Sequence, residues 1–217
     1  MDFDAVAAGW DDDEARARRT RDVADAMREV LGNRHRPRAL DVGAGTGSLS
    51  ILLADLFDEI VLVDTSPGML EVAASKVTAA GSAIGARITT LVADLADPGS
   101  AYAPAAPVDA VYSLMALHHV PDTGALFSAL GRLLTPGGLL LVADLAAEDG
   151  SFHAHHAAFD GHDGFDRHVL ESALRRAGFS PRSHETVHVV RRQIDGVVRD
   201  FPVFLAVAAR GADEPSA

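Results

Sequence analysis

The residues best suited to chemistry lie in a glycine-rich stretch, residues 40–47, between an apolar β-prone run and an amphipathic helical pattern. Gly43, Gly45 and Gly47 stand at alternate positions behind an acid, Asp41. Glycine permits a tight turn and lets a ligand lie against the backbone where a Cβ would collide. The start of the next helix offers free N–H groups and a partial positive charge. The stretch therefore predicts a polar ligand where a strand turns into a helix.

The spacing of these glycines disfavours a dinucleotide. The pyrophosphate-binding pattern is G-x-G-x-x-G, whereas here Ser48 takes the place of the third glycine of that pattern. The carboxylate of Asp41 is unfavourable beside a pyrophosphate but suits a ligand that carries an ammonium group. Taken alone, the glycines are also compatible with a tight turn that binds nothing.

Further acids and histidines follow at the ends of later apolar runs. Asp64 ends the run 60–64, and Asp94 ends the run 88–94. An acid at the end of the second strand of a β-α-β unit can accept both hydroxyls of a ribose. A fourth run, 108–113, leads into the segment 114–122, which contains His118 and His119. A Thr-Pro-Gly-Gly turn at 135–138 precedes a fifth strand over 139–143.

This ordered set resembles the class I S-adenosylmethionine-dependent methyltransferases, in particular their small members without large insertions. The resemblance runs from about Asp41 to Ala143 and implies a Rossmann-like fold and S-adenosylmethionine as cofactor. It implies that residues 43–47 cradle the methionine part, Asp64 holds the ribose, Met69 packs beside the adenine and Asp94 faces the adenine amino group. The whole set of cofactor residues expected in this way is Trp10, Asp41, Gly43, Ala44, Gly45, Gly47, Asp64, Thr65, Met69, Asp94, Leu95 and Ser113. For Trp10, the only tryptophan, an anchor in the core at the end of a helix is an equal alternative.

Composition limits the class of protein. The chain has 217 residues, 48% of them hydrophobic, which suits one globular domain with a full core. The net charge of −12 disfavours nucleic acid as a partner. The absence of cysteine excludes disulfides, thiolate metal sites and a cysteine nucleophile, and it fits a reducing cytoplasm. We expect a cytoplasmic protein, because neither a membrane-spanning run nor a signal peptide is visible.

The pattern of elements predicts an α/β protein, and the resemblance implies that residues 1–217 form a single methyltransferase domain. A cap and helix region, 1–35, precedes a cofactor-binding core, 36–145. Residues 146–210 then supply a loop on the substrate side, a helix and a hairpin whose strands, 185–191 and 203–209, flank the turn Asp195-Gly196. The expected sheet is doubly wound, seven-stranded and mostly parallel, with an antiparallel strand from the C-terminal hairpin and helices on both faces.

Histidine is the candidate general base. Methyl transfer from a sulfonium mainly requires alignment and exclusion of water, and a base helps only where the acceptor must lose a proton. For His118 and His119 we favour bracing of the loop or packing on the cofactor over catalysis.

The other histidine group lies between the fifth strand and the next helix and contains His153, His155, His156 and His162. We expect this loop to line the acceptor pocket and to move as a lid on Gly161 and Gly164, with His155 or His156 orienting or deprotonating the acceptor. A solvated loop is the second interpretation. A metal site ranks third, because the spacing matches no standard zinc pattern, so we predict no metal.

A small molecule that accepts the methyl group at oxygen, nitrogen or carbon is the expected substrate, bound by a monomer or homodimer that contacts no membrane. Residues 113–116 lack the Asn/Asp-Pro-Pro-aromatic tetrad that resembles enzymes methylating amino groups of nucleobases or glutamine. Without cysteine, covalent attack on carbon 6 of a cytosine ring to methylate carbon 5 is closed as well. Two alternatives stay open: a nicotinamide oxidoreductase with a degenerate glycine loop, and a cofactor-binding protein of the same fold without turnover.

Overall fold

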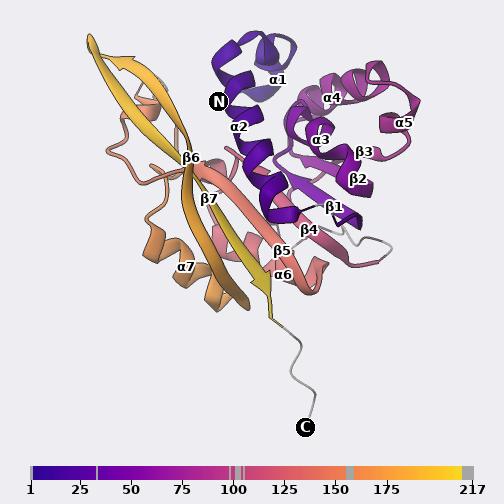
Figure 1. The fold of residues 1–217 in the computed structure, drawn as a ribbon. Helices are drawn as coiled ribbons and strands as arrows, with labels where there is room; N and C mark the ends of the chain where they lie inside the picture. Colours follow the sequence, from indigo (N-terminus) through magenta and orange to yellow (C-terminus); the bar gives the residue numbers. More distant parts are fainter. Residues whose placement is uncertain are drawn as a thin grey trace.

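The computed structural model describes residues 2–32, 34–97, 99–100, 104, 106–154 and 159–211. Among these residues, seven strands form one sheet in the order β3-β2-β1-β4-β5-β7-β6, in which β7 runs opposite to the other six strands (Figure 1). This confirms the predicted fold class. The strands are β1 (Arg36–Val42), β2 (Phe57–Asp64), β3 (Ile88–Val92), β4 (Val108–Leu114), β5 (Leu134–Leu145), β6 (Phe179–Ile194) and β7 (Val197–Arg210).

The strand order reverses beside β1, and this creates the position for a site. From β1 the chain first builds outward through β2 and β3, and then returns to the other side of β1 for β4 and β5. Asp41 of β1 is paired with Leu62 of β2 on one side and with Tyr112 of β4 on the other. In open α/β sheets, ligands bind outside the carboxyl ends of the strands at such a reversal.

Local sequence signals explain where the helices begin. Asp13 caps α2 by accepting hydrogen bonds from two backbone N–H groups, and Ser66 caps α4, whose first residue is proline. The helices are α1 (Phe3–Val6), α2 (Glu14–Leu31), α3 (Ser48–Leu53), α4 (Pro67–Ala79), α5 (Ser82–Gly85), α6 (Thr123–Leu133) and α7 (Arg167–Arg176). Short 3₁₀ turns are η1 (Ala7–Asp12), η2 (Ala54–Leu56), η3 (Leu117–His119) and η4 (Ser151–His153).

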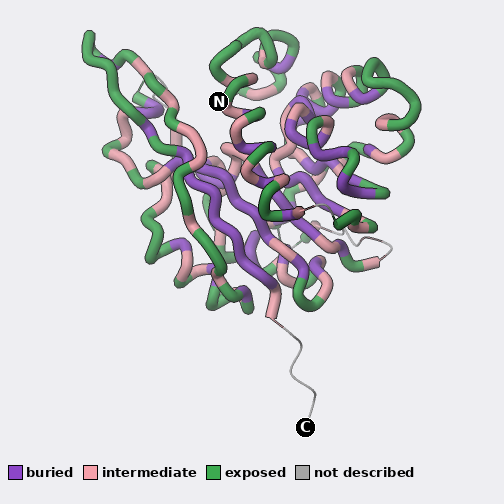
Figure 2. Tube along the Cα trace, viewed as in Figure 1, coloured by how far each residue is buried: buried purple, intermediate pink, exposed green. Residues whose placement is uncertain are grey.

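Two apolar cores cover the two faces of the sheet, and the central strands β1, β4, β5 and β7 between them are largely buried (Figure 2). Helices α2, α3 and α4 pack on one face through residues such as Met27, Leu53 and Leu70. Helices α6 and α7 pack on the other through Phe127 and Leu174. The prediction of helices on both faces is therefore confirmed, and no helix in the described part of the chain is long and apolar enough to cross a membrane.

The C-terminal half departs from the expected strand boundaries in two places. Strand β5 begins at Leu134 rather than Leu139, because the register beside β4 jumps from Val108–Leu134 to Ala110–Leu139 and the Thr-Pro-Gly-Gly residues bulge out of the pairing. The β6–β7 hairpin is longer than predicted. Its turn is the expected one, since Asp195 and Gly196 both have positive φ (50° and 82°).

Candidate active site

A cavity of about 850 Å³ opens at the carboxyl ends of β1, β2 and β4, beneath the N-terminal segment. Its wall combines residues from the glycine loop, from the ends of β2 and β3, from α2 and from the turn after β4. They include Trp10, Arg19, Asp41, Gly43, Ala44, Gly45, Asp64, Thr65, Met69, Asp94, Leu95 and His119. Ten of the twelve residues expected from the sequence to contact a cofactor line this one cavity.

Each glycine of the loop has a different reason to be glycine, although all three have positive φ (67°, 53° and 71°). A Cβ on Gly43 would collide with the Cβ of Ala116 in the turn after β4. A Cβ on Gly47 would lie 2.9 Å from Cδ1 of Leu62. A Cβ on Gly45 would meet nothing within 4 Å, because that side of the loop faces the cavity. Gly45 is therefore the position where a ligand can approach the backbone.

Asp64 ties the glycine loop to the end of β2. Its Oδ2 accepts a hydrogen bond from the Gly45 amide (2.8 Å), and its Oδ1 accepts one from the Ser66 amide (2.9 Å). A carboxylate has about four lone-pair positions, so further hydroxyl donors can still be accepted on the cavity side.

Asp41, whose carboxylate the sequence analysis matched to a ligand with an ammonium group, is buried. Only 1% of its surface is exposed, and its Oδ2 accepts a hydrogen bond from the Ser50 hydroxyl (2.7 Å), which also lies 2.7 Å from the Tyr112 hydroxyl. Burial raises the pKa of Asp41 to about 7, and the nearby charge of Asp64 contributes in the same direction. The carboxyl borders the cavity from within the core.

The remaining predicted cofactor residues separate into two groups. Met69 and Leu95 are buried and form an apolar wall of the cavity, while the exposed Asp94 accepts a hydrogen bond from the Ala96 amide (2.8 Å). Ser113 and Gly47 do not line the cavity. The Ser113 hydroxyl donates to the Val42 carbonyl (2.7 Å) inside the sheet, and Gly47 packs under the loop.

The N-terminal segment is fastened over the cavity by two acids that the sequence analysis did not single out. Asp11 accepts hydrogen bonds from the Thr46 and Ser48 hydroxyls (2.9 and 3.0 Å) and pairs with Lys76 (2.6 Å). Asp4 accepts from the Ser66 hydroxyl and from the Gly68 amide (2.5 and 2.8 Å). Trp10 lies between these two anchors in sequence, in contact with the cavity.

Arg19 of α2 brings a cation to the same wall. Burial lowers its pKa to about 10, with the nearby charge of Arg16 as the second cause, and its Nε has no hydrogen-bond partner among the described residues. A guanidinium in this situation favours an anionic group of a ligand.

The histidines are arranged differently from the expectation. His118 and His119 of η3 meet His153 of η4, whereas His155 and His156 lie outside the described residues. Burial lowers the pKa of His119 to about 3, and the nearby His118 and His153 contribute next. An imidazole with this pKa is neutral at pH 7 and is a weak general base.

The described part of the histidine-rich loop is docked against the body of the protein. The His162 amide donates to the His118 carbonyl (2.7 Å), and a Cβ on Gly161 would collide with that carbonyl oxygen. Gly164 approaches the Ala146 carbonyl in the same way. The two glycines that we expected to act as hinges therefore permit close packing.

Comparison with known proteins identifies the family. A family model for a methyltransferase domain matches residues 15–184. The chain belongs to the class I S-adenosylmethionine-dependent methyltransferases. The family resemblance seen in the sequence is thereby confirmed.

The names of the chain's relatives refer to different methyl acceptors. The chain is 27% identical over 178 residues to a phosphoethanolamine N-methyltransferase of Arabidopsis thaliana, a match covering 78% of the chain and 35% of the relative. It is 34% identical over 158 residues to a ubiquinone biosynthesis O-methyltransferase of Caulobacter, covering 66% and 60%. The chain thus spans about a third of the first relative's length and three fifths of the second's.

The fold is shared with magnesium protoporphyrin IX methyltransferase of Synechocystis, solved with bound S-adenosylhomocysteine. The TM-score is 0.65 at 22% sequence identity, and the match covers 91% of this chain and 84% of that one. At this identity the likeness supports the fold and not the acceptor.

Proposed function

We propose that this protein transfers a methyl group from S-adenosylmethionine to a small-molecule acceptor. The observation that carries the proposal is the open side of Gly45, which faces the cavity while the Gly45 amide is held by Asp64. A Cβ at this position would fill the space in which a ligand can lie against the backbone. A glycine loop beside an acid at the end of β2 fits a nucleoside that carries an amino-acid group.

Each part of the cofactor is assigned to a different set of cavity residues. When bound, S-adenosylmethionine supplies a methyl group already activated on a sulfonium. The loop from Gly43 to Gly45, with Ala44 and the buried Asp41, would hold the methionine part. Asp64 and Thr65 would hold the ribose, and Met69, Leu95 and Asp94 would surround the adenine. Trp10 would cover the cavity from the N-terminal segment.

The size of the cavity supports a second, smaller ligand beside the cofactor. Pockets for drug-sized ligands measure about 300–1,000 Å³, and this one lies near the upper end. Arg19 on its wall favours an acceptor with an anionic group. Phosphoethanolamine, which appears in the name of one relative, has such a group. The other relative is named as an O-methyltransferase, so an oxygen acceptor is also considered.

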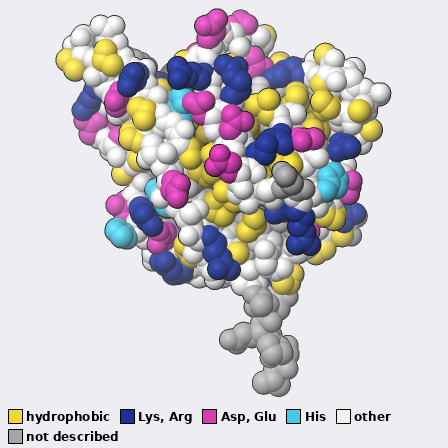
Figure 3. All heavy atoms as spheres, viewed as in Figure 1, with side chains coloured by type: hydrophobic (Ala, Val, Ile, Leu, Met, Phe, Trp, Pro, Cys, Tyr) yellow, Lys and Arg dark blue, Asp and Glu magenta, His cyan; other side chains and the backbone are white. Residues whose placement is uncertain are grey.

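The surface charge disfavours nucleic acid as the acceptor. The net charge is −12, and basic and acidic side chains are interspersed on the face shown in Figure 3. A net-acidic surface repels a phosphate backbone. A cytoplasmic location, a monomeric or homodimeric state, and a role for His155 or His156 in orienting the acceptor remain predictions from the sequence.

Calorimetry with three ligands tests the cofactor. We expect S-adenosylmethionine and S-adenosylhomocysteine to bind and NAD not to bind, because the loop lacks the pyrophosphate pattern. Binding of NAD alone would favour the oxidoreductase alternative. Turnover is then measured as S-adenosylhomocysteine release with phosphoethanolamine and a set of phenols, and cofactor binding without turnover on any acceptor would favour a non-catalytic protein.

A further inference from the structure

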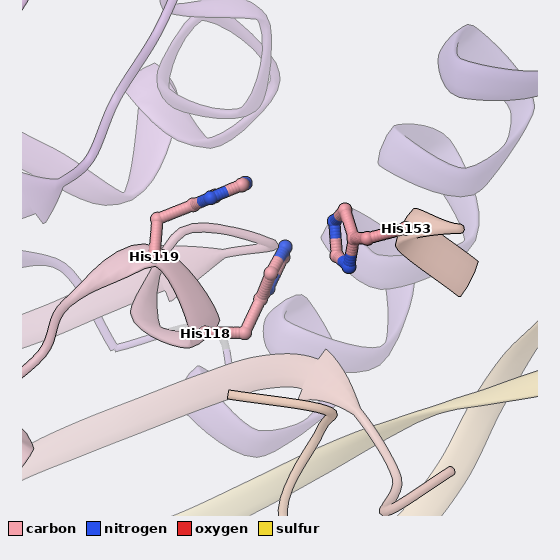
Figure 4. Close-up of side chains that lie close together, drawn as sticks. All are labelled: His118, His119 and His153. Carbon is pink, nitrogen blue, oxygen red and sulfur yellow. The ribbon is translucent and has the colours of Figure 1, made fainter. Parts of the chain in front are cut away.

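Three imidazoles from two separate segments converge beside the cavity (Figure 4). His118 and His119 come from η3 after β4, and His153 comes from η4 after β5. One ring nitrogen of each lies within 4.8 Å of those of the other two. His118 and His153 are buried, and the half-buried His119 lies on the cavity wall.

A buried carboxylate fixes the orientation of the first ring. His118 Nδ1 lies 2.5 Å from Oδ1 of Asp144, and Asp144 also accepts hydrogen bonds from the backbone amides of His118 and Leu145. A proton on Nδ1 leaves Nε2 with its lone pair. Metal-binding histidines almost always donate their other ring N–H to a carboxylate, a carbonyl or a water, and this contact sets the tautomer and the ring direction.

We propose that His118, His119 and His153 form a zinc-type metal site at the acceptor end of the cavity, with Asp144 as the positioning residue for His118. Imidazole nitrogen is a preferred ligand of zinc, and three histidines leave a fourth ligand position for water or a substrate. Nitrogens bound to one tetrahedral zinc lie about 3.4 Å apart, given zinc–nitrogen bonds of about 2.05 Å. The ring nitrogens, which lie within 4.8 Å of one another, would therefore have to approach by up to about 1.4 Å when a metal binds.

Aromatic packing explains how the segments are held together but does not account for the carboxylate. Phe159 stacks on His153 with ring centres 3.8 Å apart and planes 11° from parallel, and Phe3 meets the edge of His119 at 5.1 Å. Asp144 gives the buried His118 ring and two backbone amides their acceptor, and the same contact sets the tautomer that a metal ligand needs. The apolar rings around the imidazoles form a hydrophobic shell of the kind that limits solvent access to a metal site.

The site gives the acceptor a chemical class. A bound zinc would lower the pKa of a coordinated hydroxyl, so an acceptor with a hydroxyl oxygen would release its proton to solvent water at neutral pH without a histidine base. This role in turnover rests on the proposed function, but metal binding itself does not.

Cobalt titration of the full chain, freed of any affinity tag and stripped of metal by a chelator, tests the site. We expect one equivalent of Co²⁺ to bind with the intense visible absorption of a tetrahedral ion, and Zn²⁺ to displace it. His119→Ala and His153→Ala should each lower the affinity at least tenfold, and Asp144→Asn about tenfold to hundredfold. His35→Ala and His168→Ala, at exposed positions, are the matched controls and should bind like the parent.

The outcomes separate this proposal from the proposed function, because the titration requires neither cofactor nor acceptor. Circular dichroism establishes that each variant is folded. Absence of metal binding by the parent protein, or unchanged affinity in both His119→Ala and His153→Ala, would overturn the metal site. Metal binding with no methyl transfer to any acceptor would leave the site intact and count against the proposed function.

Discussion

His118 Nδ1 and Asp144 Oδ1 lie 2.5 Å apart, and their side chains are 2% and 0% exposed. A second histidine–aspartate pair, His35 and Asp58, has a similar distance of 2.7 Å, but its side chains are 46% and 69% exposed. Both are histidine–aspartate pairs, but Asp144 is buried and also accepts hydrogen bonds from two backbone amides. They therefore allow the combined energetic effect of burial and of these hydrogen bonds to be measured within one protein.

Removal of the two carboxylates should have unequal effects on stability. Asp144→Ala leaves the His118 ring nitrogen and two backbone amides without their acceptor in the core, and should lower the free energy of unfolding by about 2–4 kcal/mol. Asp58→Ala removes an exposed pair and should cost about 0–1 kcal/mol. Urea unfolding at pH 7 measures both, and Asp144→Asn replaces Asp144→Ala if the latter does not fold. Equal losses would show that the buried pair adds nothing.

Gly45→Val should remove cofactor binding while the fold persists. The side chain would occupy the cavity side of the loop, and a β-branched residue strains a backbone with φ of +53°. Gly137→Val is the matched control, since Gly137 has φ of +78° and open space around it but lies in the bulge of β5, away from the cavity. Calorimetry should detect S-adenosylmethionine binding by the control only. Measurable affinity in a folded Gly45→Val protein would rule out close approach of the ligand to this backbone.

Asp64→Ala should weaken cofactor binding by about 1–3 kcal/mol, the scale for losing charged hydrogen bonds to buried groups. This corresponds to roughly a 5- to 150-fold rise in Kd. The carboxylate also holds the Gly45 amide, so part of the loss would come from a loosened loop. Asp58→Ala, near the opposite end of β2, controls for the removal of a charge from that strand. If both variants bind S-adenosylmethionine like the parent, Asp64 does not hold the ribose.

The sequence predicted residues that line one wall of the cavity, because its signals are local. An apolar run, an acid at its end and a glycine-rich turn occur within a few residues, and the parallel topology brings the ends of β1, β2 and β3 to one edge. Ser113 was predicted to contact the cofactor but does not line the cavity, because its hydroxyl points into the sheet toward the Val42 carbonyl. Asp144 is an acid at a strand end, like Asp41 and Asp64. The sequence analysis ended the fifth strand at residue 143, so Asp144 fell just outside the predicted strand.

The histidine cluster could not be predicted, because it depends on contacts between distant segments. His153 lies beside His118 where the His162 amide donates to the His118 carbonyl and Phe159 stacks on the His153 ring. The hydrophobic periodicity of the sequence indicates helices and strands but does not indicate contacts between distant segments. The spacing of His153, His155 and His156 predicted a cluster within one loop. In the described structure, His153 instead lies beside the two histidines of the turn after β4.

Asp11→Ala should loosen the N-terminal segment from the cavity. Asp11 accepts two hydroxyl hydrogen bonds and pairs with Lys76, and its neighbour Asp12 is exposed and makes no side-chain hydrogen bond to a described residue. We expect faster tryptic cleavage at Arg16, Arg18 or Arg19 in Asp11→Ala and weaker binding of S-adenosylmethionine. Asp12→Ala should match the parent in both measurements. Identical cleavage rates for the two variants would show that the segment is held by its apolar contacts alone.

Asp41 should make stability depend on pH. Its pKa of about 7 in the folded protein exceeds the usual value of 3.8, so between these values the folded state holds a proton that the unfolded state has lost. The contribution of Asp41 to stability is therefore fully present below about pH 4 and is lost as the pH rises toward 7. At about 1.4 kcal/mol for each pKa unit, the loss is roughly 3–5 kcal/mol.

Asp41→Asn tests this dependence, because an amide keeps an acceptor for the Ser50 hydroxyl and does not ionise. Other titrating groups cancel when the parent and the variant are compared at the same pH without cofactor. The unfolding free energy of the parent relative to Asp41→Asn should fall by about 1.4 kcal/mol for each pH unit between pH 5 and 7 and then level off. A difference that stays constant from pH 5 to 8 in urea unfolding would mean that the buried carboxyl is already ionised at pH 5. Asp41 would then hold its charge in the core even without a cation in the cavity.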